Sequence, residues 1–432
     1  MSRKERLGPK TSRLRTAPET TRGPTIPTDV QIVEKFIAMG VKTYVEVPCS
    51  ITDTLHQLWD QKHQAGEIKL VTTNNEHDLP GIAAGIHAGT KETVLIHMQN
   101  SGLPNAADGI ISFAEADVFK IPMVALVTLR GNSPKDDSEP HQAIGKRTPR
   151  LSKSIMGDNS KIYGTPSGRR ILKSIEKAVQ KAQQGEMTMI LLPAEAFRKV
   201  TELKLPEEVV VYDQRAHMRM LEEYKKTTAI KGTSSRENPL PSNTRLTREE
   251  AMKEIVAAHS DAAILFCNGY NARAAQGSVD REGNFYNVGY MGGTLAMGWG
   301  LATSNPDIQV VVVDGDQNAS MSTFKDHLAH QYPENLFWYV LDNKTGVSVG
   351  VAKSIPLPPW TYELARVVQT IPEEPGTFVY PRVKQKGAVA KHMQAGAQAM
   401  SGFLAEHYAN WSTWIYQQTR RNIRQRALEF AH

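Results

Sequence analysis

The sequence predicts two α/β domains, each a doubly wound parallel sheet with helices on both faces. Three observations support this fold class. The chain of 432 residues is too long for one ordinary core and suits two domains of about 150 to 200 residues. Short apolar runs alternate with helical stretches in both halves, which is typical of parallel sheets. A polar stretch rich in Pro, Ser and Asn, residues 234–245, separates the halves.

The first half, residues 29–200, contains the first set of alternating elements. The helical apolar spacing of "QIVEKFIAMG" (31–40) precedes the strand-like "KTYVEVP" (42–48). The small-residue segment "GIAAGIHAG" (81–89) is expected to be a helix. Further strand-like runs are "IKLVTTNNE" (68–76), "TVLIHMQNSG" (93–102), "IPMVALVTLRG" (121–131) and "MTMILLPAE" (187–195).

The second half, residues 246–384, repeats this alternation after a linker expected over 201–245. Its first helix, "TREEAMKEIVAAH" (247–259), begins with Thr247 and has Glu250 three residues on, the pattern of a capping box. A second helix is expected in "GGTLAMGWGLATS" (292–304). Strands are expected in "AAILFCNG" (262–269), "IQVVVVDGD" (308–316), "LFWYVLDN" (336–343) and "TFVYPRV" (377–383). Residues 385–432 form a helical, aromatic and basic extension, which is a candidate for packing on a neighbouring subunit.

The net charge of +6 does not indicate a nucleic-acid-binding protein. Residues 1–28 contain seven bases and two acids, so this segment alone contributes +5 and the rest of the chain is close to neutral. The segment is rich in Pro, Thr and Ser and poor in apolar residues, so we expect it to be disordered. It lacks the apolar region of a secretion signal, although an Arg- and Ser/Thr-rich organelle address remains an alternative.

Composition also argues against a membrane protein and a disulfide. No apolar run approaches the roughly 20 residues that span a bilayer. The two cysteines, Cys49 and Cys267, lie in separate halves and are expected to be reduced thiols of a cytoplasmic protein.

Acidic and amide side chains follow two successive strands of the second half. Asp314 and Asp316 end the run of four valines, and Asn343 ends the next strand. Ligands of such sheets bind at the carboxyl ends of the strands. Carboxylate and amide oxygens suit Mg²⁺, which usually keeps phosphate oxygens among its ligands. The alternative is that Asp314 and Asp316 form only a turn and a helix N-cap.

This pattern resembles the diphosphate-binding motif of thiamin diphosphate enzymes, in which a Gly-Asp pair precedes an Asn by about 27 residues. The resemblance implies the thiamin diphosphate-binding fold, with a pyrimidine-binding domain first and a diphosphate-binding domain second. It also implies that Mg²⁺ is held by Asp316, Asn343 and the carbonyl of Thr345. Gly315, Gln317 and Asn318 would then contact the cofactor, together with Asn343.

Two further segments resemble this family. "NVGYMGGTLAMGWGLA" (287–302) is similar to the segment beneath the cofactor's two rings. Met291 would wedge the cofactor into its V shape and give its N–H to the pyrimidine ring, and Gly289 would give its carbonyl to the 4′-amino group. Helix packing is the commoner role for such a methionine. "TTNNEHDLPGIAAGIHAGT" (72–90) carries the acid, Glu76, that would bind N1′ of the aminopyrimidine and promote loss of the C2 proton.

The absence of a middle domain resembles the phosphonopyruvate and sulfopyruvate decarboxylases. "VPCS" (47–50), "MQNSGLPNA" (98–106), "EPHQAIGKRTPRL" (139–151) and residues 121–131 are similar to segments of that branch. The resemblance implies a lyase that decarboxylates phosphonopyruvate to phosphonoacetaldehyde and CO₂ in phosphonate biosynthesis. It further implies a homodimer or homotetramer with active sites between subunits. Alternatives are a sulfopyruvate or other 2-oxo acid decarboxylase or carboligase, and a non-catalytic cofactor-binding homologue.

The resemblance also implies which side chains meet the small anionic substrate. Ser50 lies at a strand-to-helix turn, Gln99 and Asn100 end a strand, and Asn100 would also contact the cofactor. His141 could donate to the substrate or transfer a proton, or it could be an ordinary loop histidine. The cations that could meet the substrate's negative charge are Arg130, Lys135 and Lys344.

The chain departs from the family at two places. Gln317 stands where the family has glycine, so a side chain lies where backbone usually approaches the diphosphate. Gly346 and Val347 stand where the family has a His-Asp pair. These changes keep the metal site but leave the substrate and the protonation step open, and they suggest the alternative of a non-catalytic homologue. Glu76 argues for catalysis, because a protein that only binds the cofactor has no need of this acid.

Overall fold

The computed structural model describes residues 26–115, 118–131, 138–157, 161–164, 170–203, 246–346, 352–354, 356–371 and 388–429. Most of the basic segment 1–28, most of the expected linker 201–245, the run 377–383, Lys135 and Val347 lie outside these residues. In the described part of the chain, no helix is both long enough and apolar enough to span a membrane.

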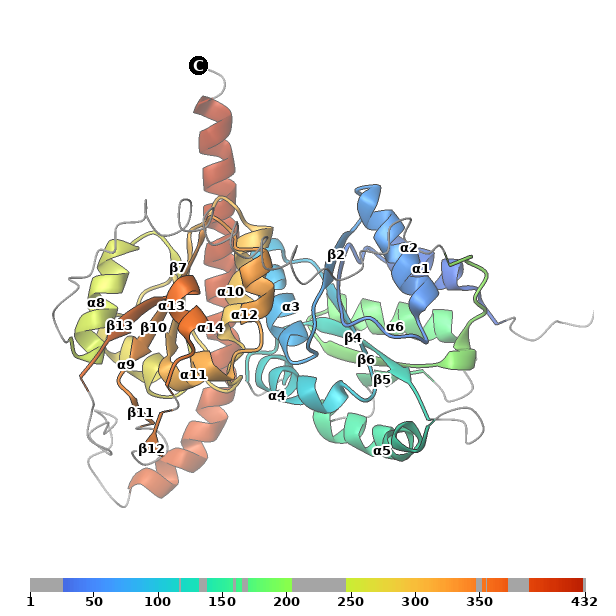
Figure 1. Ribbon diagram of the computed structural model, residues 1–432, viewed down its shortest axis with the longest axis horizontal. Coiled ribbons are helices and arrows are strands. Elements are labelled where there is room, and N and C mark those ends of the chain that lie inside the picture. The colour runs from blue at the N-terminus through green and yellow to red at the C-terminus, as the bar shows by residue number, and fades with distance from the viewer. Residues whose placement is uncertain are drawn as a thin grey trace, which may run out of the picture.

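The first half forms a six-stranded parallel sheet in the order β2-β1-β3-β4-β6-β5 (Figure 1). Its strands are β1 (Thr43–Glu46), β2 (Lys69–Thr72), β3 (Val94–Gln99), β4 (Met123–Leu129), β5 (Ile162–Tyr163) and β6 (Met187–Pro193). Its helices are α1 (Asp29–Ala38), α2 (Asp53–Gln64), α3 (Asp78–Thr90), α4 (Leu103–Ala114), α5 (Glu139–Met156) and α6 (Ile171–Gln183). Tyr44 and Leu95 are buried on one face of the sheet, whereas Val45 and Ile96 are buried on the other. Helices therefore cover both faces, which explains the continuous apolar runs.

The second half forms a five-stranded parallel sheet in the order β13-β10-β9-β7-β8. Its strands are β7 (Ala263–Phe266), β8 (Asn284–Tyr286), β9 (Val310–Gly315), β10 (Leu336–Asp342) and β13 (Arg366–Gln369), and β11 (Thr345–Gly346) pairs with β12 (Ala352–Lys353) in a separate antiparallel ribbon. Its helices are α8 (Arg248–Ala258), α9 (Tyr270–Ser278), α10 (Thr294–Ser304), α11 (Asp316–Met321), α12 (Lys325–His330) and α13 (Pro359–Leu364). The capping box expected at Thr247 and Glu250 is present, with Glu250 N–H donating to Thr247 Oγ1 at 3.2 Å.

The two halves are joined by the packing of α3 against α10 (Figure 1). A side chain at Gly85 would place its Cβ 2.0 Å from the carbonyl oxygen of Met297, and one at Gly300 would lie 2.4 Å from that of Ile82. Only glycine allows the backbones to approach this closely. As a result, one apolar cluster extends from Ile96 in the first sheet to Val312 in the second.

The C-terminal helix α14 (Ala388–Glu429) packs on its own chain. Tyr408, Trp411 and Ile415 lie at helical spacing and are all buried in the cluster shared by the two halves. Trp411 Nε1 donates to the carbonyl of Gly283 at 3.2 Å. The aromatic stripe therefore covers the junction between the halves. The extension thus packs on both halves of its own chain, and its packing on a neighbouring subunit stays a prediction.

Candidate active site

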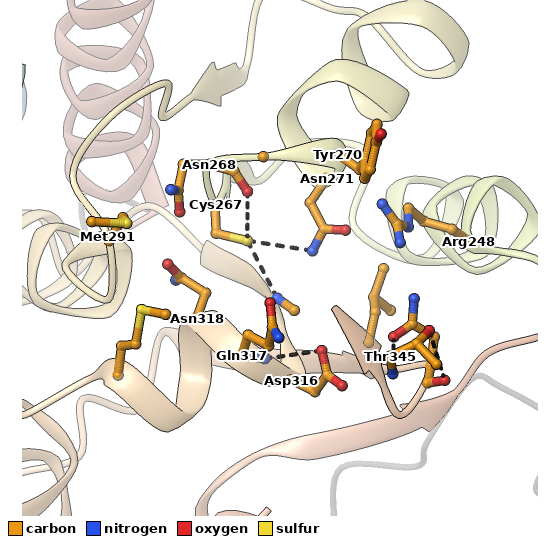
Figure 2. Close-up of a pocket in the computed structure, with 15 residues that line it drawn as sticks. Arg248, Cys267, Asn268, Tyr270, Asn271, Met291, Asp316, Gln317, Asn318 and Thr345 are labelled. Carbon is orange, nitrogen blue, oxygen red and sulfur yellow. Dashed lines mark hydrogen bonds between the residues drawn. The ribbon is translucent and has the colours of Figure 1, made fainter. Parts of the chain in front are cut away.

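The carboxyl ends of β7, β9 and β10, which are neighbours in the second sheet, surround a cavity of about 140 Å³ (Figure 2). Asp316 follows β9, and Asn343 and Thr345 follow β10, and all three side chains line the cavity. The structure thus brings together the three residues assigned to Mg²⁺. It does so because adjacent parallel strands end at the same edge of a sheet.

Asp316 has the burial and the hydrogen-bonding pattern expected of a metal ligand. It is 5% exposed, and its Oδ1 accepts the N–H of Gln317 at 2.9 Å. Its Oδ2 is buried and makes no hydrogen bond of normal geometry with the described residues, although the Ser354 hydroxyl lies close enough to interact with the carboxyl group. Burial raises the pKa of this carboxyl group above its usual value. An unsatisfied buried carboxylate oxygen is costly, and a divalent cation would remove that cost. The donor set therefore fits Mg²⁺.

Asn343 is held in place by its own turn. It is 5% exposed, and its Oδ1 accepts the N–H of Thr345 at 3.0 Å. Lys344 between them has a φ of 60°, in the left-handed region. The turn leaves the second lone pair of the amide oxygen for a metal. Within the described residues no group of three His, Cys, Asp or Glu side chains could hold a metal, so this candidate depends on one carboxylate, one amide and one carbonyl.

Asp314 does not face the cavity. Its carboxylate is fully buried and accepts hydrogen bonds from Asn318 Nδ2 at 2.6 Å and Trp338 Nε1 at 2.8 Å. Burial raises its pKa to about 6. Asn318 Oδ1 in turn accepts the N–H of Gly292 at 2.7 Å. Asp314 and Asn318 therefore position the loop before α10. Neither Asp314 nor Asp316 is the N-cap of α11, which is Gly315.

Gln317 and Gly315 both line the cavity. Gln317 lines it from the first turn of α11, and Gly315 N–H donates to Cys267 Sγ at 3.3 Å. Cys267 and Cys49 are both free and buried, as expected of reduced thiols. Burial raises the pKa of the Cys267 thiol, so it is a packing and hydrogen-bonding group in this wall.

Several lining residues were missing from the sequence prediction, four of them with strongly polar side chains. Asn268, Tyr270 and Asn271 follow β7, and Arg248 begins α8. The run "AILFCNGYN" resembles the other strand ends in having an amide after a buried strand, and this signal could have identified Asn268 and Asn271. No sequence signal marks Arg248, because its place in the wall depends on how α8 packs.

Glu76 lies between β2 and α3 and is half-buried. Asn105 Nδ2 donates to its Oε2 at 3.3 Å. The carboxyl group rests against Gly102, where a Cβ atom would come within 2.1 Å of Glu76 Oε1. The Glu76 side chain is therefore positioned by the first turn of α4.

The Glu76 and Met291 segments meet within one chain. His77 Nε2 lies 3.0 Å from the carbonyl oxygen of Met291. Asp108 Oδ2 accepts the N–H of Met291 at 3.1 Å, so this N–H, expected to face the pyrimidine ring, has an internal partner instead. The Met291 side chain is 50% exposed and lines the cavity, which differs from the buried packing role of most methionines. Gly289 N–H donates to Asn287 Oδ1 at 3.3 Å.

The residues assigned to the substrate lie at the carboxyl edge of the first sheet. Ser50 is exposed, and Arg130 Nη1 donates to its Oγ at 3.5 Å. Gln99 Nε2 donates to Ser101 Oγ at 2.8 Å. His141 in α5 lies 2.9 Å from Ser138 Oγ and is half-buried. Lys344, the other candidate for binding the substrate's negative charge among the described residues, is exposed and does not line the cavity.

Asn100 differs from the other substrate candidates. It is fully buried, and its Nδ2 donates to the carbonyl of Arg130 at 3.0 Å and to Thr148 Oγ1 at 2.9 Å. Its Oδ1 accepts the N–H of Arg130 at 3.1 Å. These bonds occupy both ends of the amide, so in this structure Asn100 ties β3 to the end of β4 and does not face a ligand.

A charged cluster beneath Ser50 was also missed. Glu46 is fully buried, contacts His56 Nδ1, and lies 3.3 Å from His97 Nδ1. Burial alone would raise the pKa of Glu46, but hydrogen bonds with His56 and His97 outweigh burial and lower it to about 2. His97 Nε2 lies 3.1 Å from Thr52 Oγ1. The cluster therefore supports the turn that carries Ser50.

No family model matches the chain. The sequence is 27% identical over 334 residues to a phosphonopyruvate decarboxylase of Streptomyces viridochromogenes, covering 75% of each chain. It is 26% identical to a sulfopyruvate decarboxylase of Methanosarcina acetivorans, covering 74% of this chain and 76% of that protein. A sulfopyruvate decarboxylase subunit beta of Methanocaldococcus jannaschii is 31% identical over 109 residues, which cover 25% of this chain and 57% of that subunit.

Solved structures agree on the fold. A thiamine diphosphate-dependent 4-hydroxybenzoylformate decarboxylase from Rhodococcus jostii RHA1 matches with a TM-score of 0.56 at 11% identity, covering 81% of this chain and 99% of that one. A thiamin diphosphate-dependent enzyme from Mycobacterium smegmatis matches with a TM-score of 0.53 at 10% identity, covering 81% and 100%. The predicted fold class and the resemblance to the phosphonopyruvate and sulfopyruvate decarboxylases are confirmed.

Proposed function

We propose that this chain, which is similar to phosphonopyruvate and sulfopyruvate decarboxylases, uses thiamin diphosphate and Mg²⁺ to decarboxylate phosphonopyruvate to phosphonoacetaldehyde and CO₂ in phosphonate biosynthesis. The observation that carries the proposal is the buried, unsatisfied Oδ2 of Asp316 in a cavity shared with Asn343 and Thr345. When bound, the cofactor supplies the ring that accepts the electrons released with CO₂.

In this proposal the residues of the second half would bind and orient Mg²⁺ and the cofactor. Asp316, Asn343 and the carbonyl of Thr345 would hold Mg²⁺ and, through it, the diphosphate. Met291 lines the same cavity with an exposed side chain, so it is placed to support the cofactor rings. Gln317 would contact the diphosphate with a side-chain amide where the family has glycine.

Glu76 exchanges a proton with N1′ of the aminopyrimidine in this proposal. Asn105 holds Oε2 of the carboxyl group at 3.3 Å, and Gly102 leaves the room that this position needs. A side chain held in one orientation transfers protons more effectively than a mobile one.

The substrate would lie at the edge of the first sheet. Phosphonopyruvate and sulfopyruvate both carry a second anionic group beside the 2-oxo acid. Arg130 offers a guanidinium next to the exposed hydroxyl of Ser50, and arginine suits phosphonate and sulfonate oxygens. The backbone of His141 packs against Gly131, the residue after Arg130, so His141 also lies at this edge and would donate a proton or a hydrogen bond there.

The same arrangement supports sulfopyruvate as a second candidate substrate, since the relatives include sulfopyruvate decarboxylases. Carboligation would use the same cofactor, and a non-catalytic homologue would bind it without turnover. Assays of purified full-length protein with thiamin diphosphate, Mg²⁺ and phosphonopyruvate, sulfopyruvate or pyruvate distinguish these functions. We expect CO₂ release to be fastest with phosphonopyruvate. Faster release with sulfopyruvate would transfer the proposal to that acid, and cofactor binding without CO₂ release from any 2-oxo acid would overturn it.

We also propose a homo-oligomer, with a homodimer as its minimal unit and active sites between subunits. In the structure the Glu76 and Met291 segments, one from each half, meet within one chain. In the proposed dimer each of these segments would meet its counterpart from the partner subunit instead.

Mixed dimers test this assembly. Glu76→Ala and Asp316→Ala proteins, each inactive, are mixed under subunit exchange. Sites between subunits predict recovery of about a quarter of the sites if pairing is random. Verified mixed dimers without recovered activity would show that each site is built within one chain.

A further inference from the structure

We infer that Arg248 is a cofactor-binding residue that contacts the terminal phosphate and makes the cavity selective for a diphosphate over a monophosphate. The inference rests on the proposed function and extends it to a residue outside the Asp316–Asn343 motif. Arg248 is the first residue of α8, and the capping box at Thr247 fixes the start of this helix.

The guanidinium of Arg248 is brought into the cavity wall by packing. The residue is only 7% exposed, and its guanidinium lies 5.6 Å from the centre of the Tyr270 ring. Arg248 and Tyr270 both line the cavity with Asp316. Figure 2 shows Arg248 and Met291 at opposite ends of the cavity, with Asp316 and Thr345 toward the Arg248 end. Arg248 thus lies at the metal end, away from the position of the cofactor rings.

The charges at this end need a cation besides the metal. Among the residues that line the cavity, Asp316 is the acid and Arg248 is the base. A diphosphate carries about three negative charges, and Mg²⁺ with Asp316 offsets only one of them, so an excess of about two remains in a buried site. The planar fork of a guanidinium suits phosphate oxygens and halves this excess.

The neighbouring wall also favours an anion. Helix α9 begins at Tyr270 beside Arg248, and its N-cap Gly269 provides no side chain to cap the helix. The N-terminus of a helix carries partial positive charge. Asn271, which lines the cavity, donates one amide hydrogen to Cys267 Sγ at 3.3 Å and has a second amide hydrogen to donate. A phosphate at this end would therefore meet the guanidinium and the start of α9 together.

The test compares full-length Arg248→Met with wild-type protein by calorimetry in the presence of Mg²⁺. Thiamin diphosphate, thiamin monophosphate and thiamin are the three ligands. Loss of a charge-assisted hydrogen-bonding partner should weaken thiamin diphosphate binding about 10- to 100-fold and leave thiamin binding nearly unchanged. Arg248→Lys should restore part of the loss, because lysine retains the charge without the fork.

Arg273→Met is the matched control. Arg273 also lies over the Tyr270 ring, at 5.8 Å, but does not line the cavity, so this variant should bind thiamin diphosphate like wild type. Thermal unfolding without ligand verifies that all variants are folded. Equal loss for all three ligands would assign Arg248 a structural role and overturn the inference, as would unchanged binding in Arg248→Met. If wild-type protein fails to bind thiamin diphosphate, it is the proposed function that fails.

Discussion

The carboxyl edges of the two sheets are built differently. At the edge of the second sheet, Asp316 and Asn343 are each 5% exposed, and the Asp316 Oδ2 atom accepts no hydrogen bond from the described part of the chain. At the edge of the first sheet, Ser50 is exposed and the buried Asn100 has used its whole amide in internal bonds. The second edge is preorganised for a metal and an anion. The first edge depends on exposed side chains that a substrate would have to order. We therefore expect the first edge to bind its substrate more weakly than the second edge binds the metal and the cofactor.

The largest difference between the edges should appear in Asp316→Ala. This change removes the only formal negative charge among the proposed metal ligands, so Mg²⁺ and thiamin diphosphate should bind at least about 100-fold more weakly. Calorimetry with Mg²⁺ and the cofactor measures the effect, and Ser50→Ala, at the first edge, is the comparison because it should leave cofactor affinity unchanged. Equal affinities of Asp316→Ala and wild type would remove the site from the second edge.

Glu76→Gln should affect the rate and not cofactor binding. Glutamine keeps the size and a hydrogen-bonding group but cannot exchange a proton with N1′ as a carboxyl group does. Loss of one general acid–base partner costs about 10²- to 10⁴-fold in rate. Cofactor affinity should fall little, because it depends on the second edge. Exchange of the cofactor's C2 proton with deuterated water, followed by NMR, should slow in step with decarboxylation, and normal exchange in this variant would contradict the role of Glu76.

Gly102→Ala should give a smaller effect through Glu76. The φ of Gly102 is −86°, so alanine is compatible with the backbone, but its Cβ would overlap the Glu76 side chain, with Cγ at 2.4 Å. We expect about a 10-fold lower rate with nearly normal cofactor affinity, since the carboxyl group must move. Gly277→Ala is the control, because no atom lies within 4 Å of a Cβ placed there. Similar kinetics for the two variants would show that the position of Glu76 on Gly102 is not needed.

The buried cluster of Glu46, His56 and His97 beneath the first edge should make the free energy of unfolding depend on pH. The pKa of Glu46 is lowered to about 2 through its hydrogen bonds with His56 and His97, so its contribution is present above its ordinary pKa and is lost as pH falls from about 4.5 toward 2. A hydrogen bond with Glu46 raises the pKa of His56, so the His56 contribution is present below about 6.5 and is lost as pH rises through the raised value.

Glu46→Gln removes both contributions. Denaturant unfolding should show a loss on the order of 3 kcal/mol near pH 6, where both groups are charged, and a smaller loss near pH 2.5. Glu176→Gln, which breaks the surface pair with Lys35 at 2.7 Å, should change stability little at either pH. A loss that is the same at both pH values would mean that Glu46 stabilises the turn by packing and not by charge.

Local sequence was enough to predict the alternation of strands and helices and the proximity of Asp316 to Asn343. These follow from local periodicity and from one rule, that adjacent parallel strands end at the same edge. The small-residue run 81–89 likewise predicted a helix, and the close packing of Gly85 against α10 explains why its residues are small.

Which polar side chains remain available to a ligand depends on the packing of the folded chain and could not be predicted from local sequence. Asp314 and Asp316 are two residues apart, yet Asp314 accepts hydrogen bonds from Trp338 and Asn318, whereas Asp316 lines the cavity and its Oδ2 accepts no hydrogen bond from a described residue. The Asn100 amide donates hydrogen bonds to Arg130 and Thr148, and Arg248 lines the cavity beside the Tyr270 ring, on which its guanidinium packs. In each case a partner distant in the chain determines the role, because hydrogen bonding and burial depend on which segments the fold brings together, and local sequence does not contain that information.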